Sequence, residues 1–220
     1  MSVRLAVFDC DGTLVDSQAN IVAAMDECFR ANGLAPPHAT LTRRIVGLSL
    51  VEAMARLLPD AEASLHSRMA DDYKTCFQRL RREEALAQEP LYDGTLASLT
   101  ALAEAGWALA VATGKSDRGL DHTLDHHAIR GHFGSLQTAD RHPSKPHPSM
   151  LERAMADLGA AREDTVMIGD TEFDMAMAVN AGVRALGVAW GYHDAETLSA
   201  AGAEIVFDDY AALTAHLLAR

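Results

Sequence analysis

Short apolar runs that end at a glycine or an acidic residue recur along the chain. The expected strands are Val3–Phe8, Trp107–Ala112, Thr165–Ile168, Val183–Ala189 and Glu204–Phe207. Each run is nearly continuous rather than alternating, which is typical of strands buried on both faces of a parallel sheet. A helical pattern follows each run. The chain is therefore expected to fold as a doubly wound α/β domain.

Glycines mark the ends of the helices between these strands. The expected helices are Ser98–Ala105 before Gly106, Ser149–Leu158 before Gly159, and Glu172–Ala181 before Gly182. Glycine is favoured directly after a helix because it adopts the left-handed backbone conformation at little cost.

A long segment after the first strand has helical spacing and no strand pattern. Apolar residues recur there at helical intervals, as at Ile21, Met25 and Phe29. Ser49 and Glu52 have the spacing of a capping box that would open one of these helices. The pattern predicts an all-helical cap domain over residues 16–85, inserted into an α/β catalytic core made of residues 1–15 and 86–220.

Composition narrows the classes of function. The 220 residues include 31 Asp and Glu against 19 Lys and Arg, a formal net charge of −12. Nucleic acids and anionic membranes bind clustered basic residues, so neither is expected as a partner. An anionic substrate would need a bound cation or a local lysine. The three cysteines form no C-x-x-C pair, and no apolar run approaches the length of a membrane span, which favours a cytoplasmic protein.

Carboxylates follow the first strand at Asp9 and Asp11, in the sequence D-C-D-G-T. Ligands bind at the carboxyl ends of strands in open α/β sheets, and alternation directs both side chains to one side. A simple turn would also explain an Asp and Gly pair. An EF-hand is excluded, because that loop requires Gly and Glu where this chain has Leu14 and Asn20.

Three further strand ends or loops carry polar groups. Thr113 and Gly114 end a strand before a helix, which outlines an anion site, although such turns are common. Lys145 lies in the proline-stiffened loop S-K-P-H-P. Asp170 and Asp174 are four residues apart and share one helical face, where Asp174 also suits the helix dipole. Clustered carboxylates favour Mg²⁺ over Zn²⁺, and Cys10 is expected to point to the opposite side of the strand from Asp9 and Asp11.

Four motifs in this order, D-C-D-G-T-L-V-D-S, A-T-G-K, S-K-P-H-P and G-D-T-E-F-D, resemble the signatures of the haloacid dehalogenase-like hydrolase superfamily. The resemblance spans the chain, and the helical insertion is similar to the small cap of the phosphoglycolate phosphatase-like branch. It implies a Mg²⁺-dependent phosphatase that hydrolyses a small phosphorylated metabolite.

The resemblance also implies roles for individual residues. Asp9 would be the nucleophile that forms an aspartyl-phosphate, and Asp11 the general acid and base. Thr113 and Gly114 would bind the phosphate, and Lys145 would bridge it to Asp9. The metal ligands would be the Asp9 carboxylate, the Asp11 carbonyl and the Asp170 carboxylate, with Asp174 supporting them.

Alternatives remain at this point. The presence of Asp11 argues against a dehalogenase, whereas a phosphosugar mutase would keep both carboxylates, and Thr13 favours a phosphatase only weakly. A non-catalytic metal or phosphate sensor would not need the full set of residues. In the cap, one of Arg43 and Arg44 is expected to point into the site and bind a second anionic group of the substrate.

Overall fold

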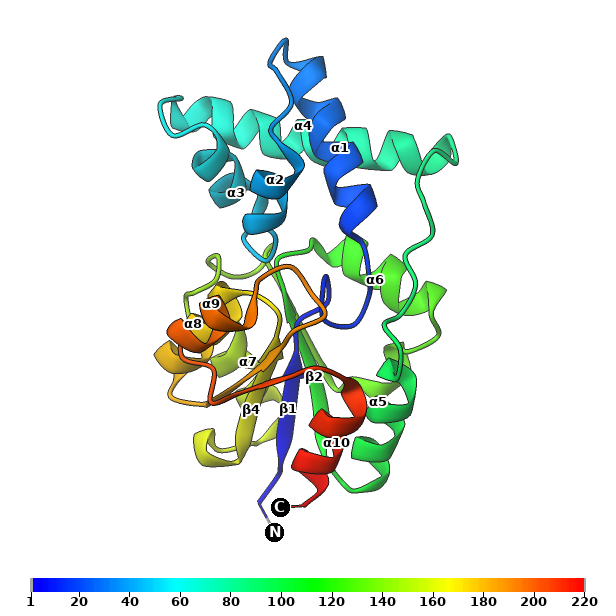
Figure 1. Cartoon of the computed structure of the whole chain (residues 1–220), viewed down its shortest axis with the longest axis vertical. Coiled ribbons are helices and arrows are strands. Elements are labelled where there is room, and N and C mark those ends of the chain that lie inside the picture. The colour runs from blue at the N-terminus through cyan, green and yellow to red at the C-terminus, as the bar shows by residue number, and fades with distance from the viewer. Residues whose placement is uncertain (1, 220) are drawn as a thin grey trace.

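The computed structural model describes residues 2–219 as a parallel six-stranded sheet with helices on both faces and a helical body above one end (Figure 1). The strand order is β3-β2-β1-β4-β5-β6, and every neighbouring pair is parallel. The strands are β1 (Leu5–Phe8), β2 (Ala108–Thr113), β3 (Ser135–Thr138), β4 (Thr165–Gly169), β5 (Arg184–Val188) and β6 (Ile205–Phe207). The predicted doubly wound α/β fold is confirmed.

One strand was not expected from the sequence. β3 is a four-residue edge strand, S-L-Q-T, that pairs with β2 from Ala110↔Ser135 onward. Its polar side chains are accommodated because Ser135 Oγ and Gln137 Nε2 each donate to Asp157 Oδ2 at 2.9 Å. A strand with so little apolar character gives no hydrophobic pattern to detect.

Alternation along β1 divides the core between the two faces of the sheet. Ala6 and Phe8 face a cluster that includes α5, α6 and α10, whereas Leu5 and Val7 face α7, α8 and α9. Cys10 continues the first of these faces and is fully buried there. These core helices are α5 (Thr95–Glu104), α6 (Asp117–His126), α7 (Ser149–Leu158), α8 (Glu172–Ala181), α9 (Ala195–Ala200) and α10 (Tyr210–Leu218).

Four helices form a separate layer above the carboxyl end of the sheet (Figure 1). They are α1 (Gln18–Ala31), α2 (Ala39–Arg44), α3 (Leu50–Leu57) and α4 (Ala63–Arg82). Met25, Phe29, Met54, Met69 and Tyr73 are buried among them, so this layer has a hydrophobic cluster of its own. Within residues 2–219, no helix has the length and apolar character needed to cross a membrane.

The expected capping box at Ser49 is wrong. Ser49 occupies the N-cap position of α3, but its side chain makes no capping hydrogen bond. Its backbone N–H instead donates to Ser144 Oγ at 2.8 Å, which ties the start of α3 to the loop that carries Lys145. The capping box that does form lies at Thr171 and Asp174, at the start of α8.

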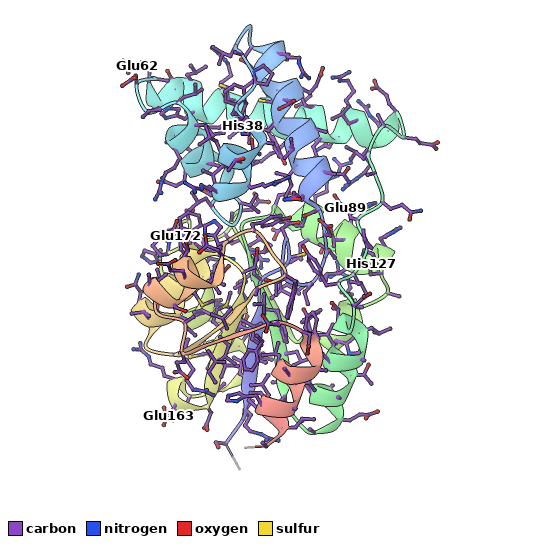
Figure 2. The ribbon with its side chains drawn as sticks, in the orientation of Figure 1. His38, Glu62, Glu89, His127, Glu163 and Glu172 are labelled. Carbon is purple, nitrogen blue, oxygen red and sulfur yellow. The ribbon has the colours of Figure 1, made fainter. Side chains whose placement is uncertain are left out.

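The chain returns from the helical layer to the sheet beside α1 and α6. Asn20 on α1 holds this segment, since its Oδ1 accepts from the Ala87 N–H at 2.8 Å and its Nδ2 donates to the Ala87 carbonyl at 2.9 Å. Further along, the Glu89 carbonyl lies 2.8 Å from His127 Nε2, and Figure 2 shows these two residues beside each other. His127 therefore binds the backbone of the segment that leads from α4 back to the sheet.

Candidate active site

Asp9 follows β1 and is almost completely buried. Its N–H donates to the Ile168 carbonyl at 2.9 Å, which continues the pairing of β1 with β4. Its Oδ1 accepts from Lys145 Nζ at 2.8 Å, whereas its Oδ2 has no hydrogen-bond partner among the described residues. Burial raises the pKa of Asp9 to about 7, against the opposing effect of Lys145. An unpartnered buried carboxylate oxygen is rare in folded proteins and indicates a site for a ligand.

Lys145 lies between two carboxylates, and its side chain has no exposed surface. Its Nζ donates to Asp9 Oδ1 at 2.8 Å and to Asp174 Oδ1 at 2.6 Å. Burial by itself lowers the pKa of Lys145, but Asp174 and Asp9 outweigh burial and the pKa is raised. The other oxygen of Asp174 accepts from the Thr171 N–H and hydroxyl, so Asp174 both caps α8 and holds the lysine.

Asp170 follows β4 and accepts two hydrogen bonds from distant parts of the chain. The donors are the Thr13 hydroxyl and the Tyr192 N–H, each at 2.9 Å. Burial first, and then the neighbouring carboxylates, raise the pKa of Asp170 well above its ordinary value. Gly12 has a left-handed φ of +86°, and a Cβ there would lie 2.1 Å from Asp170 Oδ2. Glycine is therefore required where the first loop passes this carboxylate.

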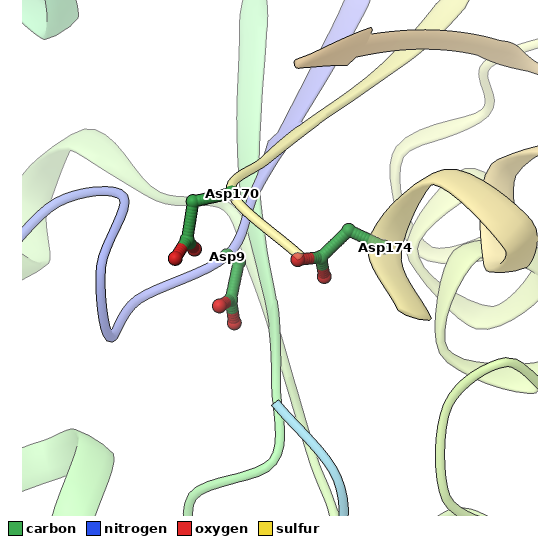
Figure 3. Close-up of side chains that lie close together, drawn as sticks. All are labelled: Asp9, Asp170 and Asp174. Atoms are coloured by element: carbon green, nitrogen blue, oxygen red, sulfur yellow. The ribbon is translucent and has the colours of Figure 1, made fainter. Parts of the chain in front are cut away.

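Asp9, Asp170 and Asp174 form one buried cluster (Figure 3). One carboxylate oxygen of each lies within 4.8 Å of the others. Three hard oxygen donors, one from each carboxylate, fit a divalent cation such as Mg²⁺, and Asp9 Oδ2 has no hydrogen-bond partner among the described residues. Asp9 and Asp170 were both expected in this set. The Asp11 carboxylate is not part of the cluster. This is compatible with the expectation that Asp11 would bind the metal through its backbone carbonyl rather than through its side chain.

Asp11 is held by two residues that the sequence reasoning missed. Its Oδ1 pairs with Lys115 Nζ at 2.8 Å and also accepts from the Ser17 hydroxyl. The Ser17 Oγ lies 3.1 Å from the hydroxyl of Tyr192, the residue whose N–H binds Asp170. The contacts of Lys115 and Ser17 with Asp11 are both made to Oδ1, and Asp11 Oδ2 accepts no hydrogen bond from the described residues.

Thr113 and Gly114 lie where β2 meets the helical layer. Thr113 is buried, and its hydroxyl accepts from the Lys115 N–H at 3.3 Å. A Cβ at Gly114 would lie 2.6 Å from the Leu48 carbonyl oxygen and 2.7 Å from that of Gly47. The glycine thus permits a loop of the helical layer to approach the end of the strand.

A cavity of about 150 Å³ lies between the sheet and the helical layer. The cavity is lined by four of the predicted site residues, which therefore lie around one common space: Asp9, Asp11, Thr113 and Gly114. Lys145 lies behind Asp9 and does not line the cavity itself.

The expectation that Arg43 or Arg44 would enter the site is wrong. Both arginines are exposed, and neither lines the cavity. α2 is only six residues long and buries Thr42, so its last two residues face solvent. The cavity is lined instead by Ile45 and Val46, which follow the helix.

Comparison with known proteins places the chain in a family. Residues 6–188 match the model of the haloacid dehalogenase-like hydrolases. The chain belongs to this family. It is 35% identical over 211 residues to the probable phosphatase IndB of Dickeya dadantii, covering 94% of this chain and 90% of that protein. It is 31% identical to a phosphoglycolate phosphatase of Agrobacterium fabrum, covering 96% of this chain and 90% of that protein.

Solved structures show the same fold. The crystal structure of a predicted phosphatase from Clostridium acetobutylicum aligns over 100% of both chains with a TM-score of 0.89 and 24% identity. The cavity above Asp9 in this haloacid dehalogenase-like hydrolase is therefore the candidate active site.

The buried lysine is expected to be essential for stability. Lys145→Met leaves Asp9 and Asp174 without their shared cation, and breaking a buried ion pair costs about 3–5 kcal/mol. In EDTA, the melting temperature should fall by roughly 6–20 °C for a chain of this size. Adding Asp174→Asn should restore part of the loss. Lys74, whose side chain is 42% exposed, gives a control, since its ion pair with Asp71 lies at the surface and Lys74→Met should shift melting little. An unchanged melting temperature in Lys145→Met would contradict the pairing.

Proposed function

We propose that this hydrolase is a Mg²⁺-dependent phosphatase that cleaves a small phosphate monoester through an aspartyl-phosphate. The observation that carries the proposal is Asp9 Oδ2, a buried carboxylate oxygen without a partner, on a residue that lines the cavity. The phosphatase names of its relatives support the same reaction class.

The chain's own residues supply the two half-reactions. Asp9 attacks phosphorus, which forms an acyl phosphate on its carboxylate and breaks the bond to the leaving oxygen. Asp11 gives its proton from Oδ2 to that oxygen, and the alcohol leaves. Asp11 then takes a proton from water, which attacks the acyl phosphate and releases inorganic phosphate and free Asp9. Lys115 and Ser17 on Oδ1 hold the Asp11 carboxyl in orientation.

Binding of the phosphoryl group falls to the end of β2 and to the buried lysine. The Thr113 hydroxyl and the Gly114 N–H would bind its oxygens, as donors at the mouth of a helix do. Lys145 would keep Asp9 ionised and offset charge beside it. Asp174 positions this lysine from behind.

Mg²⁺ would be held by the Asp9 carboxylate, the Asp11 carbonyl and the Asp170 carboxylate. When bound, it would supply positive charge to the phosphoryl oxygens. Thr13 and Tyr192 hold Asp170 in place for this role.

The helical layer would serve as a cap over the site, with residues 16–85 as its bounds and 1–15 and 86–220 as the core. Residues 1 and 220 lie outside the described part of these ranges. We propose a small phosphorylated metabolite as substrate, with no nucleic acid or membrane as partner, in keeping with the net charge of −12. The described cysteines are free and buried, which fits a cytoplasmic location.

Phosphate release from p-nitrophenyl phosphate tests the proposal directly. EDTA should abolish release, Mg²⁺ should restore it, and Ca²⁺ should restore it poorly because its larger shell enforces a looser geometry. Full activity in EDTA would contradict the proposed metal. Turnover that depends on an added sugar bisphosphate would instead indicate a phosphosugar mutase.

Mg²⁺ should also stabilise the protein more at pH 8 than at pH 6. The folded pKa of Asp9 is raised from 3.8 to about 7, so in the metal-free protein stability is lost as pH rises through that range. Mg²⁺ needs the ionised carboxylate and would offset that loss. A thermal melt with and without Mg²⁺ at both pH values measures the difference, and a larger shift at pH 6 would count against the Asp9 site.

A further inference from the structure

The two walls of the cavity differ in chemistry. The core side presents the groups of the proposed phosphate site, with Asp9, Asp11 and Thr113 among them. The cap side is mostly apolar and includes Met25, Ile45, Leu48, Leu50, Tyr73 and Phe77. A substrate bound through its phosphate would therefore place its leaving group against hydrocarbon.

An apolar wall selects among leaving groups. Sugar hydroxyls that face these apolar side chains would lose water and gain few donors or acceptors in return, which costs free energy. An apolar or aromatic body would gain contact with Tyr73 and Phe77 instead. The wall thus favours a compact apolar leaving group over a polyhydroxylated one.

Two arginines line the cavity without an acidic partner among the described residues, and Arg81 is the one on the apolar cap side, since Arg118 lies on α6 of the core. Arg81 lines the cavity near the end of α4, and its Cζ lies 5.0 Å from the centroid of the Phe77 ring. Among the described residues it forms no ion pair, whereas Arg79 on the same helix pairs with both Glu27 and Glu83. This contrast arises in a chain with 31 acidic residues.

The position of the Arg81 guanidinium over the Phe77 ring suits it to bind a planar anion. Stacking on an aromatic face orients a guanidinium and leaves its N–H donors free for a carboxylate. Across the opening, Arg118 Nη1 on α6 donates to Gln78 Oε1 on α4 at 3.2 Å, which joins core and cap near the same turn of α4. Arg81 is thus held at a cavity edge that both domains form.

We propose that the substrate is a phosphate monoester whose leaving alcohol has an apolar body and ends in a carboxylate, and that Arg81 binds this carboxylate. The inference rests on the proposed phosphatase activity and adds the class of substrate. Arg81 thus takes the role that the sequence pattern suggested for Arg43 or Arg44, from a different helix.

Two aryl phosphates of nearly equal size test the inference. 4-Carboxyphenyl phosphate carries the terminal anion, and 4-carbamoylphenyl phosphate replaces it with a neutral amide. The wild type should show a higher kcat/KM for the carboxylate, and Arg81→Gln should lower the ratio of the two values by roughly tenfold, mainly through KM. Arg82→Gln, at the exposed neighbouring position, should leave the ratio as in the wild type.

The outcomes separate this inference from the proposal on which it rests. If neither ester is hydrolysed in the presence of Mg²⁺, the phosphatase proposal fails. If both are hydrolysed but Arg81→Gln and Arg82→Gln give the wild-type ratio, only the role of Arg81 is overturned. A preference of the wild type for sugar phosphates over both aryl esters would overturn the apolar leaving group.

Discussion

Asp9→Asn is expected to lower phosphatase activity by roughly 10⁴-fold or more while the fold survives. Removal of a nucleophile disables the whole catalytic unit, and losses of this order are measured for such residues. The amide occupies the same volume as the carboxylate. It also removes a charge that burial already disfavours, as the raised pKa of about 7 shows, so the variant should fold at least as well in EDTA.

Steady-state release of phosphate, together with a thermal melt, measures both parts of this expectation. Asp208→Asn provides the control, because Asp208 is exposed and lies outside the cavity. That variant should keep wild-type turnover. Wild-type-like turnover in Asp9→Asn would remove the aspartyl-phosphate from the mechanism.

Most of the fold could be predicted because its core strands are buried on both faces. β1, β2, β4, β5 and β6 follow the expected apolar runs to within two residues, and α7 and α8 begin and end as expected. Gly159 and Gly182 end these helices with a φ of +68°, as the pattern of glycines indicated. β3 could not be predicted, because its polar side chains are satisfied by Asp157 on α7, a partner that is distant in sequence.

Some residues of the candidate site could likewise be predicted from the sequence, and others could not. Groups directly after strands could be found from the sequence, since parallel strands bring their carboxyl ends to one edge. Asp9 and Asp170 directly follow β1 and β4, and Thr113 is the last residue of β2. The contacts of Tyr192 could not be predicted from the sequence, because its partners are distant along the chain. Asp170 is 22 residues away and Ser17 is 175 residues away.

The direction of side chains on the short helices of the cap could not be predicted from the sequence either. Arg43 and Arg44 directly precede Ile45, which lines the cavity, but both are exposed because Thr42 takes the buried position of α2.

Lys115 could be suspected from the sequence only weakly, because it directly follows Thr113 and Gly114. Its pairing with Asp11 depends on β1 and β2 being neighbours in the sheet.

Asp11→Asn is expected to separate substrates by their leaving groups. Asp11 has one oxygen bound to Lys115 and Ser17 and one free, and the residue lines the cavity together with Asp9. An alkoxide leaves poorly without a proton, so kcat for an alkyl phosphate such as butyl phosphate should fall by roughly 10²–10⁴-fold, the usual contribution of general acid catalysis. p-Nitrophenolate leaves without a proton, so its first release should lose much less.

Pre-steady-state kinetics show this difference most directly. Without a base to activate water, Asp11→Asn should release a burst of p-nitrophenolate close to one equivalent per site and then turn over slowly, as the acyl phosphate on Asp9 accumulates. Lys115→Met provides the matched comparison, because it removes the orienting cation and keeps the carboxyl. It should lower turnover of both esters by similar, smaller factors. Equal losses on both esters in Asp11→Asn, with no burst, would mean that Asp11 does not carry the proton.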